Sequence, residues 1–471
     1  MHSIRAHRSG MVLAPSGFME RPVHDREPLA EDITSPVVYL DMERLDTVLR
    51  RLRRERPVVW VDREPYRAFW AVLRHADVTE VERQHELFIS SARLTLIPKD
   101  IEDSANTTAG GARQTLRVLK ALAALSQRPM GDLLEWFQAR RAHRHAGRNE
   151  RVRTLIDMDE PEHRRFRDLT QSWFMGAGVR RLEATIEATA QRYVTQMREG
   201  GPELDFAREV AMQYPLTIIM TMLGLPEQDA PFVLRATQQL LNASDPDLGR
   251  SEGYGVQTVT ELFEYYVDVV RHRRRRPGED LVSVIANARI DGKPLGPVET
   301  LSYLLIVTIA GHETTSASIS GGFKAFIDHP AERLRFRPEP EAARIMADEV
   351  VRWVTPIRHF CRTATRDCEV GGVRIARGES LALLYPSANR DESEFTAPYE
   401  FRIDRKPNRH LGFGHGVHHC LGRVLALTEI RAFFSMLLPQ LREVEYAGPA
   451  LSIESNLTGG LKSLPVRVRF H

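Results

Sequence analysis

Apolar residues recur at helical spacing through the middle of the chain. From Glu162 to about Met346 they return every three or four positions, the period at which side chains share one face of an α-helix. The pattern is interrupted at Gly200–Pro202, Pro226 and Pro277–Gly278, where glycine and proline are expected to end helices. We therefore predict a mainly helical body over this range.

One of these helices is unusually long. We expect it to run from Pro297 to His329, which at 1.5 Å per residue gives about 50 Å, enough to cross the whole molecule. Its most apolar stretch, Leu301 to Gly311, is shorter than the ~20 residues that a bilayer requires. The stretch therefore predicts a buried helix.

Alternating β-forming residues predict small sheets near both ends of the chain. Pro57–Trp60 and Tyr66–Val72 flank a charged turn and are expected to pair as strands. Within Cys368–Leu384, Gly371–Gly372 has the composition of a two-residue hairpin turn, and Val466–Phe470 predicts a last strand. The predicted fold class is mainly α with small antiparallel β-sheets.

The chain shows no internal repeat and no long low-complexity tract. We predict a single domain over residues 41–471, preceded by an N-terminal extension at residues 1–40. Residues 97–150 break the helical pattern with a loop rich in Thr, Gly and Ala, short helical stretches and a crowd of Arg and His. We interpret them as an elaborated loop.

Composition narrows the classes of partner. The 65 Lys and Arg residues nearly balance 63 Asp and Glu residues, so the net charge of +2 creates no global field for nucleic acid or membrane. The run Arg271–Arg276 lacks interleaved aromatic residues and is interpreted as a solvated helix end, not as a nucleic-acid site.

Residues 1–23 lack the apolar stretch of a signal peptide or anchor, so we expect a cytoplasmic protein with no membrane partner. Three cysteines without C-x-x-C spacing indicate a reducing compartment.

Cys420 stands at the start of a predicted helix. Unpaired backbone N–H groups and the positive end of the helix favour a thiolate there, which is the form that binds metal. Three glycines let the backbone come close to the sulfur: Gly414, Gly416 and Gly422. A single thiolate suits haem iron. The alternatives are a buried cysteine packed as a small hydrophobe and a zinc site completed by nearby histidines: His415, His418 and His419.

The residues around Cys420 resemble a known signature. Phe413–Gly422 reads F-G-H-G-V-H-H-C-L-G, and it matches every fixed position of F-G-x-G-x-H-x-C-x-G, the haem-binding pattern of the cytochrome P-450 family. The resemblance implies haem b (iron protoporphyrin IX), with Cys420 as the thiolate ligand of the iron, His418 as a donor to a haem propionate and Gly422 at the cofactor. In that family the thiolate favours O–O cleavage. The resemblance also implies the cytochrome P-450 fold, with a long central helix over the haem.

A second motif lies inside the long helix. Ala310, Gly311 and Thr314 share one helical face, where small side chains leave room beside a hydroxyl for a diatomic ligand. Glu313 is a carboxylate in apolar sequence and a candidate proton carrier. The segment A-G-H-E-T-T resembles the oxygen-activating motif of the same family, which implies that Glu313 and Thr314 are catalytic and that Ala310 and Gly311 border the cofactor. The alternatives are a threonine bonded to its own helix and a glutamate on a solvated face.

A glutamate and an arginine stand three residues apart on another predicted helix. Glu349 and Arg352 share a face and can pair bidentately. They resemble the E-x-x-R motif of the family, and Arg405 matches the later arginine that completes that network. The resemblance implies a structural role for these three residues.

Three further residues are expected at the haem propionates. His163 and Arg167 stand four residues apart and present two hydrogen-bond donors on one helix face, which suits a pair of carboxylates. The segment resembles the propionate-binding helix of the family, and Arg362 resembles a further propionate-binding position.

The resemblance implies a monooxygenase that inserts one atom of O2 into a small lipophilic substrate. Segments such as Tyr214–Leu216 and Asn408–Gly412 look most like the terpineol-hydroxylating members, so a terpenoid-like substrate is expected. The tail after Cys420 is too short for a fused reductase, so we expect electrons from a ferredoxin and an NAD(P)H-dependent ferredoxin reductase. The alternatives are a steroid hydroxylase, a peroxide-driven fatty-acid peroxygenase and a haem gas sensor without catalysis.

Overall fold

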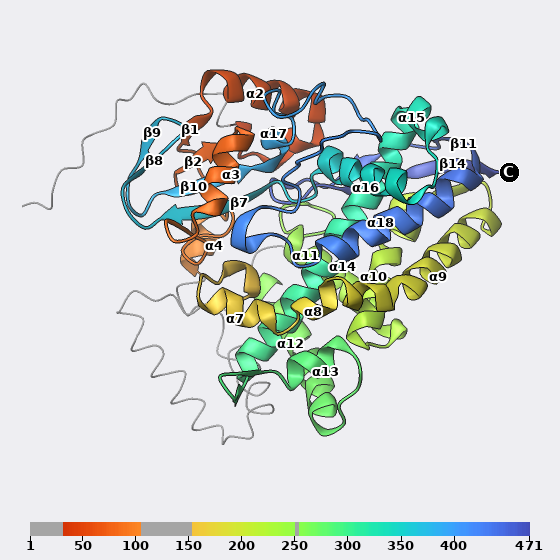
Figure 1. Cartoon of the computed structure of the whole chain (residues 1–471), viewed down its shortest axis with the longest axis horizontal. Coiled ribbons are helices and arrows are strands. Elements are labelled where there is room, and N and C mark those ends of the chain that lie inside the picture. The colour runs from red at the N-terminus through yellow and green to blue at the C-terminus, as the bar shows by residue number, and fades with distance from the viewer. Residues whose placement is uncertain (1–31, 105–152, 250–253) are drawn as a thin grey trace, which may run out of the picture.

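The protein is described here by a computed structural model, which covers residues 32–104, 153–249 and 254–471 (Figure 1). Residues 1–31 of the predicted extension, most of the predicted loop at 97–150 and the run of Arg and His within it lie outside the described residues. Helices dominate the part that is described, as the apolar spacing predicts.

The bounds of the α-helices are as follows: α2 Met42–Glu55, α3 His75–Arg83, α4 Lys99–Ser104, α7 Glu162–Asp168, α8 Gln171–Phe174, α9 Ala177–Glu199, α10 Gln213–Leu223, α11 Ala230–Leu241, α12 Tyr254–Arg275, α13 Leu281–Ala286, α14 Pro297–Asp328, α15 Pro330–Arg335, α16 Pro340–Val354, α17 Tyr385–Ala388 and α18 Arg423–Leu437. Short 3-10 and π turns join them: η2 Pro36–Leu40, η4 Leu155–Asp157, η5 Ala207–Ala211, η6 Glu227–Asp229, η7 Gly416–His418 and η8 Leu438–Gln440.

The strands are short: β1 Val58–Val61, β2 Phe69–Val72, β3 Phe88–Ile89, β4 Glu203–Asp205, β5 Arg289–Ile290, β6 Lys293–Pro294, β7 His359–Ala364, β8 Cys368–Val370, β9 Val373–Ile375, β10 Ser380–Leu384, β11 Leu441–Tyr446, β12 Leu451–Ser452, β13 Leu461–Ser463 and β14 Pro465–Phe470. The largest sheet has the order β1-β2-β10-β7-β3. It lies with α2, α3 and α17 at one end of the molecule, and the long helices occupy the other end (Figure 1).

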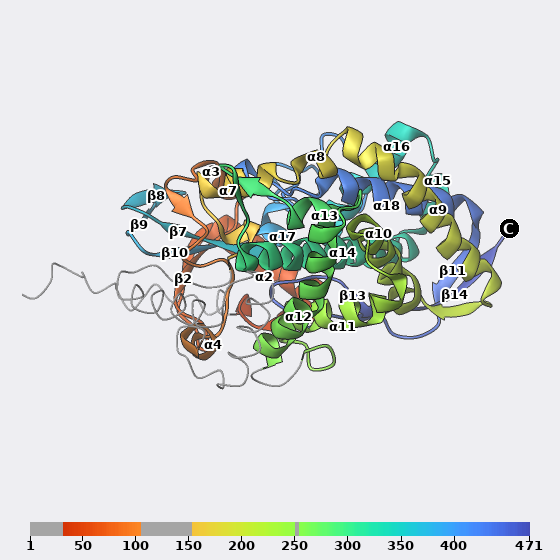
Figure 2. The same cartoon turned by 90° about the horizontal axis from the view of Figure 1, so that it is seen from below.

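The long helix predicted from Pro297 to His329 is α14, which ends one residue earlier. Pro297 opens it at the first helical position, where a missing N–H has no cost. Residues 301–308 are all buried, because other helices surround this half of α14. Figure 2 shows α14 running through the middle of the molecule. None of the described helices combines the length and the apolar character that a membrane crossing requires.

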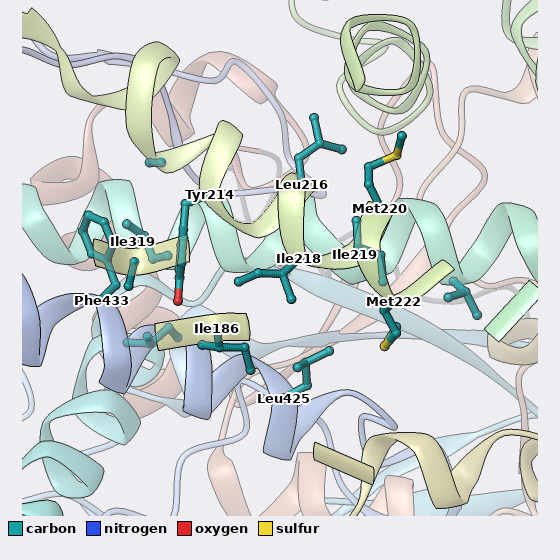
Figure 3. Close-up of a cluster of buried hydrophobic side chains, with 14 of the residues drawn as sticks. Ile186, Tyr214, Leu216, Ile218, Ile219, Met220, Met222, Ile319, Leu425 and Phe433 are labelled. Carbon is teal, nitrogen blue, oxygen red and sulfur yellow. The ribbon is translucent and has the colours of Figure 1, made fainter. Parts of the chain in front are cut away.

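Helix α10 fills the space beside α14. Figure 3 shows Tyr214 and Ile218 directed from α10 toward Ile186 of α9 and Leu425 and Phe433 of α18. All five side chains are almost completely buried, and burial of a side chain such as Ile218 contributes about 1.5–3 kcal/mol. This packing fixes α10 against α9 and against α18, the helix that follows Cys420.

The sheets differ from the prediction in one pairing. The expected first pair of strands is β1 with β2, and the expected hairpin is β8 with β9, where Val370 and Val373 flank the turn. Both pairs are antiparallel. Strand β10, however, pairs with β2 in parallel, with Leu381 opposite Trp70. Strands so far apart in sequence are not joined by a hairpin, so turn geometry does not force them to run antiparallel.

The domain begins earlier than predicted. Ile33, Val38 and Tyr39 are buried, although they fall within the predicted extension at residues 1–40. The Tyr39 hydroxyl donates to Ile33 O at 3.0 Å, and Asn456 Nδ2 donates to Thr34 O at 2.9 Å. Residues 33–40 therefore pack as part of the body that starts at α2.

Candidate functional site

The loop before α18 wraps tightly around Cys420. Cys420 N donates to Phe413 O at 2.9 Å, which closes the loop on itself. Gly414 and Gly416 have φ angles of 65° and 66°, which other residues rarely adopt. A Cβ on Gly416 would lie 2.2 Å from Glu82 O, so this glycine also lets the loop pack against α3. The hydrogen bond and the two glycines together hold the Cys420 sulfur at a fixed place in the loop.

Backbone N–H groups and burial act on Cys420 in opposite directions. The N–H groups of Gly422 and Arg423 donate to the sulfur, and the guanidinium groups of Arg167 and Arg423 lie near it. Burial has the larger effect and raises the pKa of the thiol above its ordinary value. The N–H groups and the two guanidinium groups oppose this effect and favour the thiolate, the form that binds metal. A bound iron ion would favour the thiolate further.

Two histidines meet beside the loop. The rings of His163 on α7 and His418 on η7 have centroids 4.3 Å apart. His163 Nδ1 lies 3.2 Å from Glu160 Oε1, and His418 Nε2 lies 3.2 Å from Ser90 Oγ. Burial, assisted by the positive charge of Arg362, lowers the pKa of His418 to about 2, so its ring is neutral at physiological pH. A neutral imidazole still donates one N–H.

Arg362 lies on β7, on the other side of His418. Its Nη2 is 3.6 Å from Glu82 Oε1, and the Tyr385 hydroxyl donates to the same oxygen at 2.8 Å. Glu82 Oε2 has no hydrogen-bond partner among the described residues. Burial raises the pKa of Glu82 to about 7, although Arg362 and Tyr385 lower it. Arg362 therefore faces a carboxyl group that is half neutralised near pH 7.

The donors around Cys420 fit the two propionates of a haem. Arg167 makes no ion pair within the described part of the chain, and it lies close enough to His163 and His418 to lower the pKa of both. Among the described residues, Arg362 pairs with the Glu82 carboxyl at 3.6 Å, and its Nη1 donates to Cys361 O at 2.9 Å. Carboxylates are the groups that guanidinium binds best, so Arg167 and Arg362 can both bind a further carboxylate. The structure thus brings His163, Arg167, Arg362 and His418 together, as the sequence predicts.

Ala310 and Thr314 mark an uncovered face in the middle of α14. Ala310 is exposed although residues 301–308 before it and 315–320 after it are buried. The Thr314 hydroxyl donates to Ala310 O at 3.3 Å, so Thr314 is bonded to its own helix in this structure, as one of the alternatives expects. The face has small side chains and one hydroxyl, as the motif predicts.

Gly311 lies against α10. A Cβ at this position would lie 2.7 Å from Ile219 Cδ1 on α10. Gly311 therefore makes room for close packing of α10 against α14. The helical spacing places it near Ala310, but a glycine has no side chain to direct toward a cofactor.

Glu313 is held by one residue outside the motif, Thr237, and by its neighbour within the motif, His312. Its side chain is 11% exposed, so it does not lie on a solvated face. The Thr237 hydroxyl of α11 lies 3.1 Å from Glu313 Oε1, and His312 Nε2 lies 3.3 Å from the same oxygen. Glu313 and Thr314 also line a cavity together with Ser316 and Ala317. The carboxyl group is thus positioned between a polar contact and an open space.

The third predicted group forms a buried network. Arg352 donates to both oxygens of Glu349, at 2.7 and 2.8 Å. Arg405 Nε lies 3.1 and 3.2 Å from the same two oxygens. Arg352 also donates to the carbonyls of Asn389 and Pro398, both at 2.9 Å. The network ties α16 to the segment that leads into the Cys420 loop.

The zinc alternative receives no support from the geometry. Within residues 32–104, 153–249 and 254–471, no three His, Cys, Asp or Glu side chains are arranged to hold a metal ion. The histidines beside Cys420 face other partners, such as Arg83, whose Nε donates to His415 Nε2 at 3.1 Å.

The sequence did not reveal three residues of the site. Glu82, Thr237 and Tyr385 come from α3, α11 and α17, far from either motif along the chain. No local signal marks Glu82, because most of its neighbours along the chain are polar or charged.

Known proteins share both the sequence and the fold. A model of the cytochrome P-450 family matches residues 132–445. The chain is 33% identical to cytochrome P-450-terp of a Pseudomonas species, over 94% of this chain and 97% of the relative. It is 30% identical to a steroid C26-monooxygenase of Mycolicibacterium smegmatis, over 90% of each chain.

A solved structure has the same fold over nearly its whole length. The crystal structure of CYP108D1 from Novosphingobium aromaticivorans superposes with a TM-score of 0.79 at 31% identity, over 95% of this chain and 99% of that one. CYP268A2 of Mycobacterium marinum, solved with pseudoionone, gives a TM-score of 0.77 at 29% identity, over 96% of this chain and all of that one. The chain belongs to the cytochrome P-450 family of monooxygenases, whose cofactor is haem b.

Proposed function

We propose that this protein hydroxylates a small, terpenoid-like substrate with O2 and with electrons from a separate ferredoxin and its NAD(P)H-dependent reductase. The observation that supports this best is the convergence of Cys420 with a set of propionate donors: His163, Arg167, Arg362 and His418. Cys420 would bind the iron and the four donors would hold the propionates. Haem bound there would supply the activation of O2 and its insertion into a C–H bond.

Glu313 and Thr314 have separate parts in proton delivery. Glu313 Oε1 is anchored by Thr237, yet the side chain also lines the cavity. The carboxyl group can therefore accept a proton on one side and release it on the other. Thr314 carries a hydroxyl beside the uncovered face of α14, where it can donate a hydrogen bond once it leaves Ala310 O. Together, Glu313 and Thr314 would deliver protons one after the other.

The cavity beside Glu313 and Thr314 has both apolar and polar walls. Apolar side chains come from four separate segments, Met212, Leu241, Ile453 and Leu461, and polar side chains such as Asn242 and Ser320 complete the lining. With about 20 Å³ of space for the centre of a water molecule, it has room for water but not for the whole substrate, so it would border the substrate site. The similarity to cytochrome P-450-terp supports a terpenoid-like substrate. The similarity to a steroid C26-monooxygenase makes a steroid the second candidate.

The electron donor would bind near the Cys420 loop. Arg83 and Arg423 flank this loop, and neither forms an ion pair with a residue of the loop itself. Positive side chains around the sulfur would attract an acidic ferredoxin and orient it.

The proposal is tested by binding and by turnover. Terpenoids, steroids and fatty acids are titrated into the haem-loaded protein, and a low-spin to high-spin change identifies the compound that fits. That compound is then turned over with ferredoxin, reductase, NAD(P)H and O2, or with hydrogen peroxide alone. We expect a terpenoid to bind and to be hydroxylated only with the ferredoxin chain. Turnover with peroxide alone would establish a peroxygenase, and O2 binding without any product would establish a sensor.

A variant pair tests the role of Thr314. Thr314→Ala should divert electrons from product to hydrogen peroxide by about tenfold or more, which is the order of one lost proton-transfer group. Thr221→Ala is the control, because Thr221 is likewise bonded to its own helix, through Thr217 O, but is exposed on α10. Equal product yields from the two variants would contradict the assignment.

A further inference from the structure

His312 is a buried histidine whose two ring nitrogens both have partners. Its side chain is 0% exposed, and Nδ1 lies 2.9 Å from Thr308 O. A backbone carbonyl only accepts hydrogen bonds, so Nδ1 carries a proton. If the ring is neutral, Nε2 then carries a lone pair and must accept.

The neighbours of Nε2 do not fit an ionised Glu313. Nε2 lies 3.3 Å from Glu313 Oε1. A lone pair and a carboxylate oxygen are both acceptors and repel each other at this distance. The contact becomes favourable when one proton lies between the two atoms. That proton belongs either to a neutral carboxyl group or to a charged imidazolium.

Thr237 cannot resolve the conflict alone. Its hydroxyl lies 3.1 Å from His312 Nε2, 3.1 Å from Glu313 Oε1 and 3.0 Å from Leu234 O. A hydroxyl has one proton, so it can donate to only one of these three acceptors at a time. Thr237 holds the two side chains in place, and the pair still needs a proton of its own.

The surroundings favour the neutral form of the pair. Among the described residues, His312 is the one ion-pair contact of Glu313, and no arginine or lysine lies against either group. The Thr308 hydroxyl, on the residue whose carbonyl meets His312 Nδ1, is itself bonded to the Tyr266 hydroxyl, which is uncharged. Burial of two unpaired charges is costly, whereas a neutral acid that donates to a neutral imidazole avoids that cost.

The opposite side of Glu313 opens to a cavity that can hold water. The cavity has about 20 Å³ of space for the centre of a water molecule, and about 10–15 Å³ suffices for one molecule. Ser316 Oγ lines it and has no hydrogen-bond partner among the described residues. A proton released from Glu313 therefore has a polar place to go.

We propose that Glu313 and His312 share one proton, held between Oε1 and Nε2, and that His312 is a positioning residue that keeps Glu313 protonated and ready to deliver it. This inference rests on the proposed role of Glu313. In each cycle the Glu313 O–H bond breaks and its proton passes to the cavity side. One proton from solvent then restores the bond, so the pair returns to its starting charge.

Infrared spectroscopy tests the shared proton without turnover. The wild-type protein at neutral pH should show a carboxylic-acid C=O band that is lost in Glu313→Gln. We expect His312→Gln to lose the same band, because the amide N–H₂ of glutamine can donate to Glu313 and so stabilises the carboxylate. His272→Gln, at an exposed position of α12, should keep it. Absence of the band in the wild type, or its persistence in His312→Gln, would overturn the proposal.

A second variant guards against misfolding. If His312→Gln does not bind haem or fold, Thr237→Val replaces one hydroxyl with a methyl group in a side chain of the same shape, and it should shift the frequency of the band. An unchanged band in Thr237→Val would contradict the hydrogen-bonded trio. Failure of hydroxylation in every protein would refute the proposed function but leave the infrared result standing.

Discussion

The two sides of the candidate haem site hold their polar groups in different ways. On the side of Cys420, hydrogen-bond donors are held in fixed positions: backbone N–H groups of Gly422 and Arg423 donate to the sulfur, and arginine and histidine donors converge beside it. On the side of α14, the side chains are uncharged or can become uncharged. In the contacts among Glu313, His312 and Thr237, acceptor atoms outnumber the protons available to them.

This difference matches two chemical tasks. A metal ligand and its propionate partners must stay in one place and one charge state, so rigid donors serve them. A proton carrier must change its charge state in every cycle, so its partners must tolerate both forms. We expect variants on the Cys420 side to affect stability and haem binding most, and variants on the α14 side to affect proton use.

The buried Glu349 network should show the largest effect on stability. Glu349→Gln leaves Arg352 and Arg405 without their carboxylate, and breaking a buried pair in this way costs about 3–5 kcal/mol of unfolding free energy. Urea unfolding of the haem-loaded protein measures the loss. Glu341→Gln, which breaks the exposed pair with Arg344, should change stability little. Equal losses of unfolding free energy in the two variants would show that the buried network stabilises the protein no more than an exposed ion pair does.

Glu82 should make stability depend on pH on the Cys420 side. Its folded-state pKa is raised from 4.5 to about 7, so its stabilising contribution is full below about pH 4.5 and is lost as the pH rises through 7. The shift corresponds to ~3 kcal/mol at most. Glu82→Gln cannot titrate, so it should gain stability relative to the wild type across this range.

Urea unfolding at a series of pH values measures that difference. Glu369→Gln, at an exposed position of β8, controls for the loss of one carboxylate. A constant difference between the wild type and Glu82→Gln from acid to neutral pH would mean that Glu82 does not bind a proton in the folded state.

Gly311 should show the smallest effect, on the α14 side. The added Cβ of Gly311→Ala would meet Ile219 Cδ1 at 2.7 Å, and such overpacking costs about 1–3 kcal/mol. Ile219→Val removes that Cδ1 atom, so the double variant should recover part of the loss. Gly255→Ala in α12 has open space and should instead stabilise by about 0.5–1 kcal/mol. Equal stability changes for the two alanine variants, measured by thermal unfolding, would argue against close packing at Gly311.

The sequence predicted the features that lie close together along the chain. The Cys420 loop, the α14 motif and the Glu349–Arg352 pair are each short patterns with a local physical cause, and the structure brings the propionate donors together as expected. The long α14 follows from continuous apolar spacing.

The remaining features depend on contacts between distant segments. Thr237 and Glu313 are 76 residues apart, and Tyr385 is 303 residues from Glu82. The parallel pairing of β2 with β10 joins equally distant strands. Periodicity and motifs describe neighbours along the chain, so they could not identify these partners. The close approach of Gly311 to Ile219 on α10 could not be identified for the same reason.

The coordination of iron by Cys420 is tested most directly by the spectrum of the reduced, carbon-monoxide-treated protein. The wild type should show the red-shifted Soret band of a thiolate-bound haem. Cys420→Ser should lose that band, whereas Cys368→Ser, which changes the other partly exposed cysteine, should keep it. A wild-type protein that binds haem without the band, or a Cys420→Ser variant that retains it, would contradict the account.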